Sequence, residues 1–251
     1  MSLTTANSVP AHADRIHRPL TRVAILIVSV LVAVVALAFG PAGGAAFADQ
    51  AIAQCDGLDN TGGLEIKCDV TVTNNLNVAT GVASSVVTVT ACQGAADALS
   101  SCVGPVTTSY NTLTTSVNQC NDSENGAGAV VICSVQVINN ITGGTSPTAA
   151  TVNQCVGSGA EGTEPTLACN PFPATTSNAT VTQCNKSANG GGAQMRVTCT
   201  VATGSTESSQ LAVTINQCNG SANGGGSIVT CKTELTTLAL AAAVELPKVS
   251  G

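Results

Sequence analysis

The stretch Gln217-Cys218-Asn219-Gly220-Ser221-Ala222-Asn223-Gly224-Gly225-Gly226-Ser227-Ile228-Val229-Thr230-Cys231 decides the fold of this chain, because its pattern recurs along the sequence after residue 54. Similar stretches run over 183–199 and 119–133, and a more divergent one runs over 54–68. Each begins with Gln-Cys, continues with turn-forming residues and reaches a second cysteine inside a β-branched run. A recurring pattern of this kind predicts a repeat protein built from stacked units.

The 12 cysteines of the chain divide it into six units, which we number 1 to 6 in chain order. Alternate units are evenly spaced: 65 and 64 residues separate Cys55, Cys120 and Cys184, and this spacing predicts three double repeats. The first and second cysteines of units 1 to 6 are Cys55 and Cys68, Cys92 and Cys102, Cys120 and Cys133, Cys155 and Cys169, Cys184 and Cys199, and Cys218 and Cys231.

Alternating β-branched segments flank the Asn/Gly turn of each unit. Residues 85–90 and 211–216 precede a first cysteine, whereas 66–72 and 131–137 contain a second one. A period of two residues is typical of strands, and helix signals are nearly absent apart from 238–246. We therefore predict an all-β fold of six disulfide-stapled, hairpin-like repeats that form a stacked β-solenoid or a sandwich.

The alternation also predicts the direction of each cysteine side chain. Cys133 shares a face with Val131 and Val135 and should point inward, whereas strict alternation would place Cys218 on the other face, with Asn216. We therefore infer a bulge or the end of the strand at Gln-Cys, which lets the first cysteine turn inward to its partner.

The N-terminal 48 residues have the pattern of a secretory signal: basic residues up to Arg22, an apolar run over 23–39 and the small-residue site Ala46-Phe47-Ala48. Cleavage between Ala48 and Asp49 leaves a repeat domain over 49–234 and a tail over 235–251. The alternative is a retained membrane anchor, because 17 apolar residues are at the short end of a bilayer span.

An even number of cysteines in an exported chain predicts structural disulfides. We expect each first cysteine to bond to the second cysteine of its own unit, because the turn between them closes at little entropic cost. A loop of this length contributes about 3 kcal/mol in the chain-entropy model. The alternative links neighbouring units, for example Cys68 to Cys92.

Composition excludes several classes of function. Residues 49–251 carry 13 acidic and five basic side chains, a net charge of −8, so a cationic groove for nucleic acid is not expected. The same residues contain no histidine and no tryptophan. Zinc sites of the usual spacing, activated thiols and hydrolase triads are therefore not expected, and neither is a cofactor.

Carboxylates in the turns are the remaining candidates for chemistry, and we expect them to be solvated turn residues. Calcium is an alternative at two turns, because their oxygen ligands are of the hard type it prefers, but the turn 219–226 contains no carboxylate. Exposed threonine pairs are a further candidate, as a hydroxyl array for ice or glycan. The carboxylate pairs are Asp56 with Asp59, Asp122 with Glu124, and Glu161 with Glu164, and the threonine pairs are Thr71/Thr73, Thr88/Thr90 and Thr180/Thr182.

Units 2 and 4 depart from the Asn/Gly turn pattern, over 92–102 and 155–169. Because they belong to the same phase of the double repeat, we expect them to share a face of the molecule. The motif Gln-Cys-Asn-x-Ser-x-Asn-Gly-Gly-Gly, with a cysteine about 13 residues after the first, resembles exported repeat proteins encoded in actinobacterial genomes. The resemblance covers most of 54–234. It implies secretion by a high-GC Gram-positive bacterium and no activity.

From these features we expect a secreted structural, cell-surface or extracellular-matrix repeat protein without catalytic activity. An extracellular binding module for glycan or protein, using the Asn/Gly loops, is the alternative. Expected partners are other copies of the chain or a surface protein or glycan, with membrane contact only through the N-terminal segment if it is uncleaved.

Processing is directly testable. N-terminal sequencing of protein from culture supernatant should begin at Asp49, because signal peptidase cleaves after small-x-small sites. A membrane-bound species that retains residues 23–39 would contradict this prediction.

Overall fold

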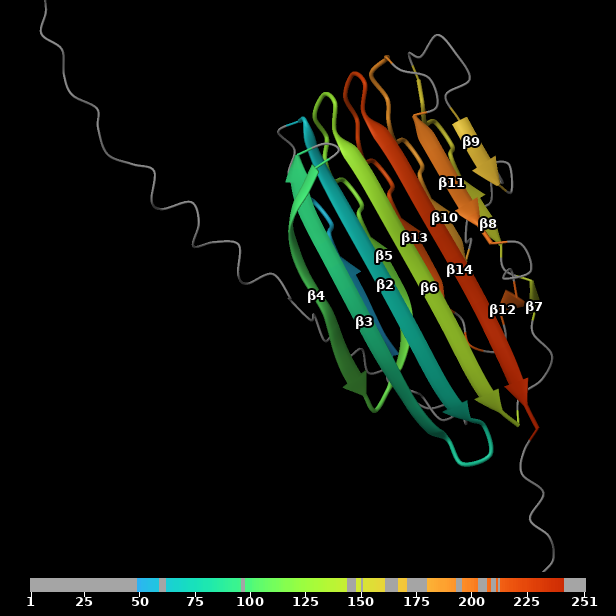
Figure 1. Cartoon of the computed structure of the whole chain (residues 1–251). Coiled ribbons are helices and arrows are strands. Elements are labelled where there is room, and N and C mark those ends of the chain that lie inside the picture. The colour runs from blue at the N-terminus through green and yellow to red at the C-terminus, as the bar shows by residue number, and fades with distance from the viewer. Residues whose placement is uncertain are drawn as a thin grey trace, which may run out of the picture. The chain divides into compact units, whose positions relative to one another are not determined.

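The computed structural model describes residues 49–58, 62–95, 98–143, 148–149, 151–160, 167–170, 180–192, 196–202, 207–208, 211 and 213–241. All regular structure in these residues is β-strand, which confirms the predicted fold class. The strands form two larger sheets and one small pair (Figure 1). The signal segment, Asp59, Glu161, Glu164 and residues 242–251 lie outside the described residues.

The first sheet, sheet A, contains the five strands that end at a Gln-Cys pair. All neighbours in it are parallel. In spatial order its strands are β1 (Asp49–Gln54), β5 (Leu113–Gln119), β13 (Thr214–Gln217), β10 (Val181–Gln183) and β8 (Val152–Gln154).

The second sheet, sheet B, contains the strands that carry the second cysteines. Its spatial order is β4 (Ala98–Tyr110), β3 (Val82–Ala95), β2 (Leu64–Asn77), β6 (Val130–Thr142), β14 (Ile228–Leu240), β11 (Val197–Val201) and β9 (Leu167–Asn170). The last five strands in this order are parallel to one another, and β3 and β4 add an antiparallel hairpin at one edge. A separate antiparallel pair joins β7 (Thr148–Ala149) to β12 (Glu207–Ser208).

Five units are therefore arches rather than antiparallel hairpins. In units 1, 3, 4, 5 and 6 the first strand belongs to sheet A and the second to sheet B, and the Asn/Gly segment forms an arc between the sheets. Side chains alternate with a period of two residues along the strands of an arch and of a hairpin alike. The sequence pattern therefore could not distinguish the two ways of joining the strands. Unit 2 alone, β3 with β4, is the expected hairpin.

The arches stack in the order 1, 3, 6, 5, 4, which differs from their order in the chain. The chain passes from unit 1 to unit 3 in one direction along the stack, then from unit 4 through unit 5 to unit 6 in the other. The strands of all five arches run in the same direction, but the two segments advance in opposite directions along the stack. They therefore coil about the axis of the stack with opposite handedness. Unit 6 closes the gap between units 3 and 5.

Units 2 and 4 lie at opposite edges of sheet B, so the expectation that they share a face is wrong. The double-repeat spacing coincides with spatial neighbours only for units 1 and 3. The edge strand β4 carries Pro105, and its pairing with β3 contains two register shifts, features that discourage pairing with another chain. Its apolar side chains are nevertheless exposed, with Val103 at 64% and Val106 at 48%.

Six disulfides join the two cysteines of each unit, the pairing expected from the spacing. In the five arches the bonded Cα atoms lie 6.5 to 6.7 Å apart, because the bridge crosses from one sheet to the other. In unit 2 they lie 4.0 Å apart, because Cys92 and Cys102 are direct cross-strand partners.

The core fills the space between the sheets with small aliphatic side chains. Val117 and Ile215 of sheet A pack with Val135, Val137 and other residues of sheet B in one cluster. The disulfides of the five arches form a second buried cluster at the arcs. Strand β14 continues to Leu240, past the domain boundary expected at 234, and replaces the first part of the helical tail expected over 238–246.

Hydrogen bonds between arches should contribute measurably to stability. Asn219 is the central test, because its Oδ1 accepts from the Asn185 N–H at 3.0 Å and its Nδ2 donates to Asn121 Oδ1 and to the Thr182 carbonyl, also at 3.0 Å. Asn219→Ala should lower the free energy of unfolding by about 1–3 kcal/mol, since it leaves these partly buried groups without partners. Urea unfolding with intact disulfides measures this.

Asn140→Ala is the matched control. Asn140 Nδ2 donates to Asn75 Oδ1 at 2.9 Å in an exposed pair on the outer face of sheet B. This change should cost less than about 0.5 kcal/mol, as is usual for surface positions. Equal losses in the two variants would contradict a special role of the arcs.

Candidate functional site

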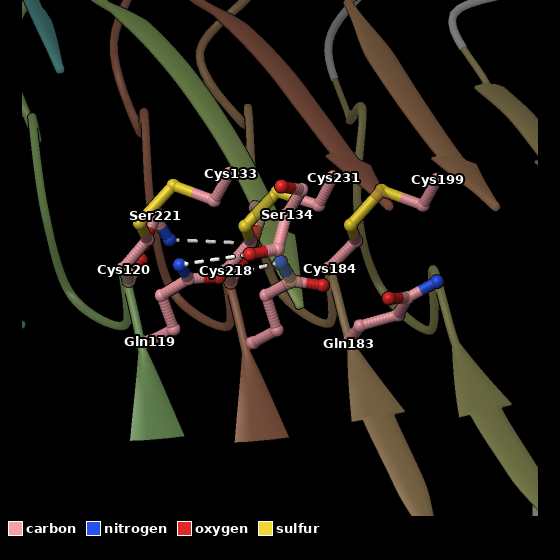
Figure 2. The surroundings of a disulfide bond; sticks show 12 residues. Gln119, Cys120, Cys133, Ser134, Gln183, Cys184, Cys199, Cys218, Ser221 and Cys231 are labelled. Atoms are coloured by element: carbon pink, nitrogen blue, oxygen red, sulfur yellow. Dashed lines mark hydrogen bonds between the residues drawn. A yellow bond between two sulfur atoms is a disulfide. The ribbon is translucent and has the colours of Figure 1, made fainter. Parts of the chain in front are cut away.

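The five arcs carry repeated polar side chains, and they begin where the sheet A strands end. Each strand ends at a glutamine, and the following cysteine has a φ between 56° and 62°. This left-handed conformation is rare for a residue with a Cβ atom. It turns the sulfur inward to the disulfide, which confirms the strand end inferred at Gln-Cys (Figure 2).

Backbone hydrogen bonds continue from the strands into the arcs along the stack. The N–H of Cys120 donates to the Gln54 carbonyl, that of Cys218 to the Gln119 carbonyl and that of Cys184 to the Gln217 carbonyl. The arcs are therefore stacked in register as the strands are. Each arc position therefore lies next to the same position in the neighbouring arc.

An asparagine ladder uses this register at the residue after the first cysteine. Each side-chain Oδ1 accepts a hydrogen bond from the backbone N–H of the neighbouring arc on the unit 4 side. The pairs, with N···O distances, are Asn121 to Asp56 at 2.7 Å, Asn219 to Asn121 at 3.0 Å, Asn185 to Asn219 at 3.0 Å and Val156 to Asn185 at 2.8 Å.

A second asparagine ladder repeats the arrangement four residues later in the arc. Asn223 donates its N–H to Asn125 Oδ1, Asn189 donates to Asn223 Oδ1, and Ala160 donates to Asn189 Oδ1, at 2.8 to 3.0 Å. Both ladders run in the same direction. At the unit 4 end they reach Val156 and Ala160, which have no side-chain acceptor.

A serine ladder lies between them and runs in the opposite direction. Each hydroxyl accepts from the backbone N–H of the arc on the unit 1 side and donates to the first-cysteine carbonyl of that arc. The ladder begins at Leu58, which supplies only its N–H. The accepting hydroxyls are Ser123 from Leu58, Ser221 from Ser123, Ser187 from Ser221 and Ser158 from Ser187.

Buried glutamines bond the arches where the strands end. Gln217 Nε2 donates to Gln119 Oε1 at 2.7 Å, and Gln183 Nε2 donates to Gln154 Oε1 at 2.6 Å. The Thr233 hydroxyl of β14 lies within 3.0 Å of the Oε1 atoms of Gln183 and Gln217. Figure 2 shows Gln119 and Gln183 beside the disulfides of units 3, 6 and 5.

A shallow groove of about 510 Å³ crosses the outer side of arcs 3, 6 and 5. Gly220, with φ +70°, lines the groove, and the Asp122 carboxylate occupies the space where a Cβ atom on this glycine would lie. Lys186 on the next arc is exposed. The groove is lined by Asn118, Asn121, Asp122, Thr182, Asn185, Lys186, Asn216, Asn219 and Gly220.

The carboxylates proposed from the sequence have different surroundings. Asp56 Oδ1 accepts two hydrogen bonds from Asn121, whereas Asp122 is exposed and Glu124 is buried. The expected pairing of Asp122 with Glu124 is therefore not a shared exposed site. In the described part of the chain, the groups of three or more potential metal ligands are cysteine sulfurs, and these are disulfide-bonded.

The threonine pairs form only a short array. Thr71 lies opposite Thr88, and Thr88 Oγ1 lies 3.0 Å from Thr107 Oγ1. On its other side, Thr71 pairs with Gln136. A hydroxyl row across the whole of sheet B is therefore absent at this position.

Arg196 is a structural residue that the sequence pattern did not indicate. Its side chain is fully buried, Nη2 donates to the Ala160 carbonyl of unit 4 at 2.7 Å, and Nη1 donates to the Gly191 carbonyl at 3.2 Å. Nε has no hydrogen-bond partner among the described residues. The guanidinium thus joins unit 5 to the end unit of the stack.

Comparison with known families identifies the domain. The sequence profile of a domain of unknown function, DUF8253, matches residues 51–238. The chain belongs to this family. The matched residues begin in β1 and end in β14, so the DUF8253 domain includes all six units. No curated protein and no solved structure shows a significant match to the chain.

Two further observations concern the DUF8253 domain. No helix among its described residues is long and apolar enough to cross a membrane. Six disulfides are typical of an oxidising, extracellular environment.

The pKa of the Asp56 carboxyl gives a test of the ladder end. Burial raises this pKa above its ordinary value of 3.8, the hydrogen bonds from Asn121 oppose the rise, and nearby Asp122 adds to it. The folded state therefore holds the proton more tightly than the unfolded state. The free energy of unfolding falls as the pH rises from the unfolded-state pKa of 3.8 through the higher pKa of the folded state. Asp56→Asn should be more stable than the wild type at pH 7, with a difference that vanishes at pH 3.

Urea unfolding of both proteins between pH 3 and pH 7 measures this difference. Asp122→Asn removes only the smaller Coulombic contribution and should change stability less. An Asp56→Asn protein that is less stable than wild type at pH 7 would show that the hydrogen bonds from Asn121 to the ionised carboxylate outweigh the cost of its burial.

Proposed function

We propose that this DUF8253 protein is a secreted structural or surface protein without catalytic activity. One observation carries the proposal: the repeated polar residues of the motif are engaged in bonds between arches. Asn219 and Ser221, at the centre of the stack, each make hydrogen bonds to the arcs on both sides. The motif is thereby explained by the assembly of the scaffold, with no ligand required.

The energetics of the arcs support the same proposal. A buried hydroxyl such as that of Ser221 is costly without partners, and here it is fully bonded. Five disulfides close the arcs and a sixth closes the edge hairpin, so a small aliphatic core is supplemented along the whole stack. Such a domain suits a protein that must persist outside the cell.

A binding module is the second candidate, and the groove over Gly220 favours it. Asp122 and Lys186 stand on its borders, and their charged groups take no part in the asparagine or serine ladders. The amide and hydroxyl groups of Asn118, Asn216 and Thr182 face the same groove. Hydroxyl-rich glycan is the ligand class that matches amides, a carboxylate and an ammonium without an aromatic platform.

A glycan array probed with the purified mature protein separates the two candidates. The structural proposal expects no saturable binding, together with resistance to protease that is lost when the disulfides are reduced. Saturable binding that disappears in Asp122→Ala and Lys186→Ala, but persists in the exposed-face control Lys232→Ala, would replace it with the binding module. Protease resistance of each variant shows that the fold is intact.

A further inference from the structure

The disulfides of the five arches form one column along the stack. Register places Cys68, Cys133, Cys231, Cys199 and Cys169 side by side on neighbouring strands of sheet B. The bridges of units 3, 6 and 5 lie next to one another in Figure 2. The column is thus a consequence of stacking identical arcs.

The sulfur atoms of different bridges in this column lie close together. Those of Cys55, Cys68 and Cys120 are all within 4.8 Å of one another, and so are those of Cys133, Cys218 and Cys231. The sulfur atoms of unit 1 therefore lie within 4.8 Å of the first sulfur of unit 3, and the second sulfur of unit 3 lies within 4.8 Å of both sulfur atoms of unit 6. The two contacts together form a path through the bridge of unit 3.

We propose that units 1, 3 and 6 of this column are a path for thiol–disulfide exchange. When an external thiol attacks Cys55 and opens the Cys55–Cys68 bridge, Cys68 is released as a thiolate and the free thiol moves from unit to unit. A thiolate at Cys68 attacks Cys120 and forms a Cys68–Cys120 bond, while the Cys120–Cys133 bond breaks. Cys133 leaves as a thiolate and takes up the proton that Cys68 released. Cys133 then attacks Cys218 or Cys231 in the same way, so bonds and electrons balance at each step.

The fold restricts this exchange to stack neighbours. A mixed bridge between adjacent arches joins positions that are already side by side, so the sheets need not separate. Burial disfavours the attacking thiolate, so exchange is slow at neutral pH and accelerates as the pH rises. The bridge of unit 2 stays outside the path, because Cys68 pairs with Ala91, so the adjacent Cys92 points to the opposite face of sheet B.

Variants of the mature chain that each lack one cysteine test the proposal without any added reductant, because the partner of the replaced cysteine supplies the free thiol. Cys55→Ser leaves a thiol at Cys68, and Cys68→Ser leaves one at Cys55; both thiols adjoin Cys120. After incubation at pH 8, acid quenching, denaturation and alkylation, peptide mapping locates the free thiol. We expect loss of at least half of the label from the original cysteine, with gain at Cys133 and then at Cys218 or Cys231, in both variants.

Cys102→Ser is the matched control and should keep its thiol at Cys92. Circular dichroism before quenching confirms that each variant is folded. A label that stays at Cys68 and at Cys55 in the folded variants overturns the proposal. So does a label scattered over unit 2 and over arches that are not stack neighbours, since that pattern reports exchange in unfolded chains.

Discussion

In-register hydrogen bonding between neighbouring arcs is the constraint on which the rest of this structure depends. The backbone bonds from Cys120 to Gln54 and from Cys218 to Gln119 fix each arc directly on the next. Side chains at equal positions must then fit one another. Asparagine and serine fit because each offers an acceptor to a backbone N–H and a donor to its neighbour. The recurrence of Gln-Cys-Asn-x-Ser-x-Asn follows from this requirement.

The ends of the stack explain where the motif fails. Units 3, 6 and 5 have a neighbour on both sides and carry the full set of ladder residues. Unit 1 has Leu58 in place of serine, because no arch lies on the side to which that hydroxyl would donate. Unit 4 has Val156 and Ala160 in place of asparagine, because no arch follows to donate to their side chains. The departures from the repeat thus record the spatial order of the units.

The sequence predicted the elements of this fold better than their arrangement. Alternation and the Gln-Cys boundary predicted the strands, their ends and the inward sulfurs, since these depend on local geometry. The arches were not predicted, because residues such as Val131, Cys133 and Val135 alternate in the same way in an arch and in a hairpin. The position of unit 6 between units 3 and 5 depends on contacts 98 residues apart, as between Asn219 and Asn121. The sequence did contain an indication of the stacking order: Leu58, Val156 and Ala160 replace ladder residues and mark units 1 and 4 as the ends of the stack. The burial of Arg196 had no such indication in the sequence.

The capped ladders also limit how the protein can assemble. A further arch placed on unit 4 would find no acceptor at Val156 or Ala160, so its backbone N–H groups would lose the bonds that every internal arch makes. At the other end, β3 already occupies the edge of β2 in sheet B, so a new arch could not pair with both strands of unit 1. Unpaired backbone groups at such a contact are costly. Growth of a continuous stack from copies of this chain is therefore disfavoured. Among the described residues, the sheet faces, the arc groove and the β4 edge are surfaces to which a partner could bind.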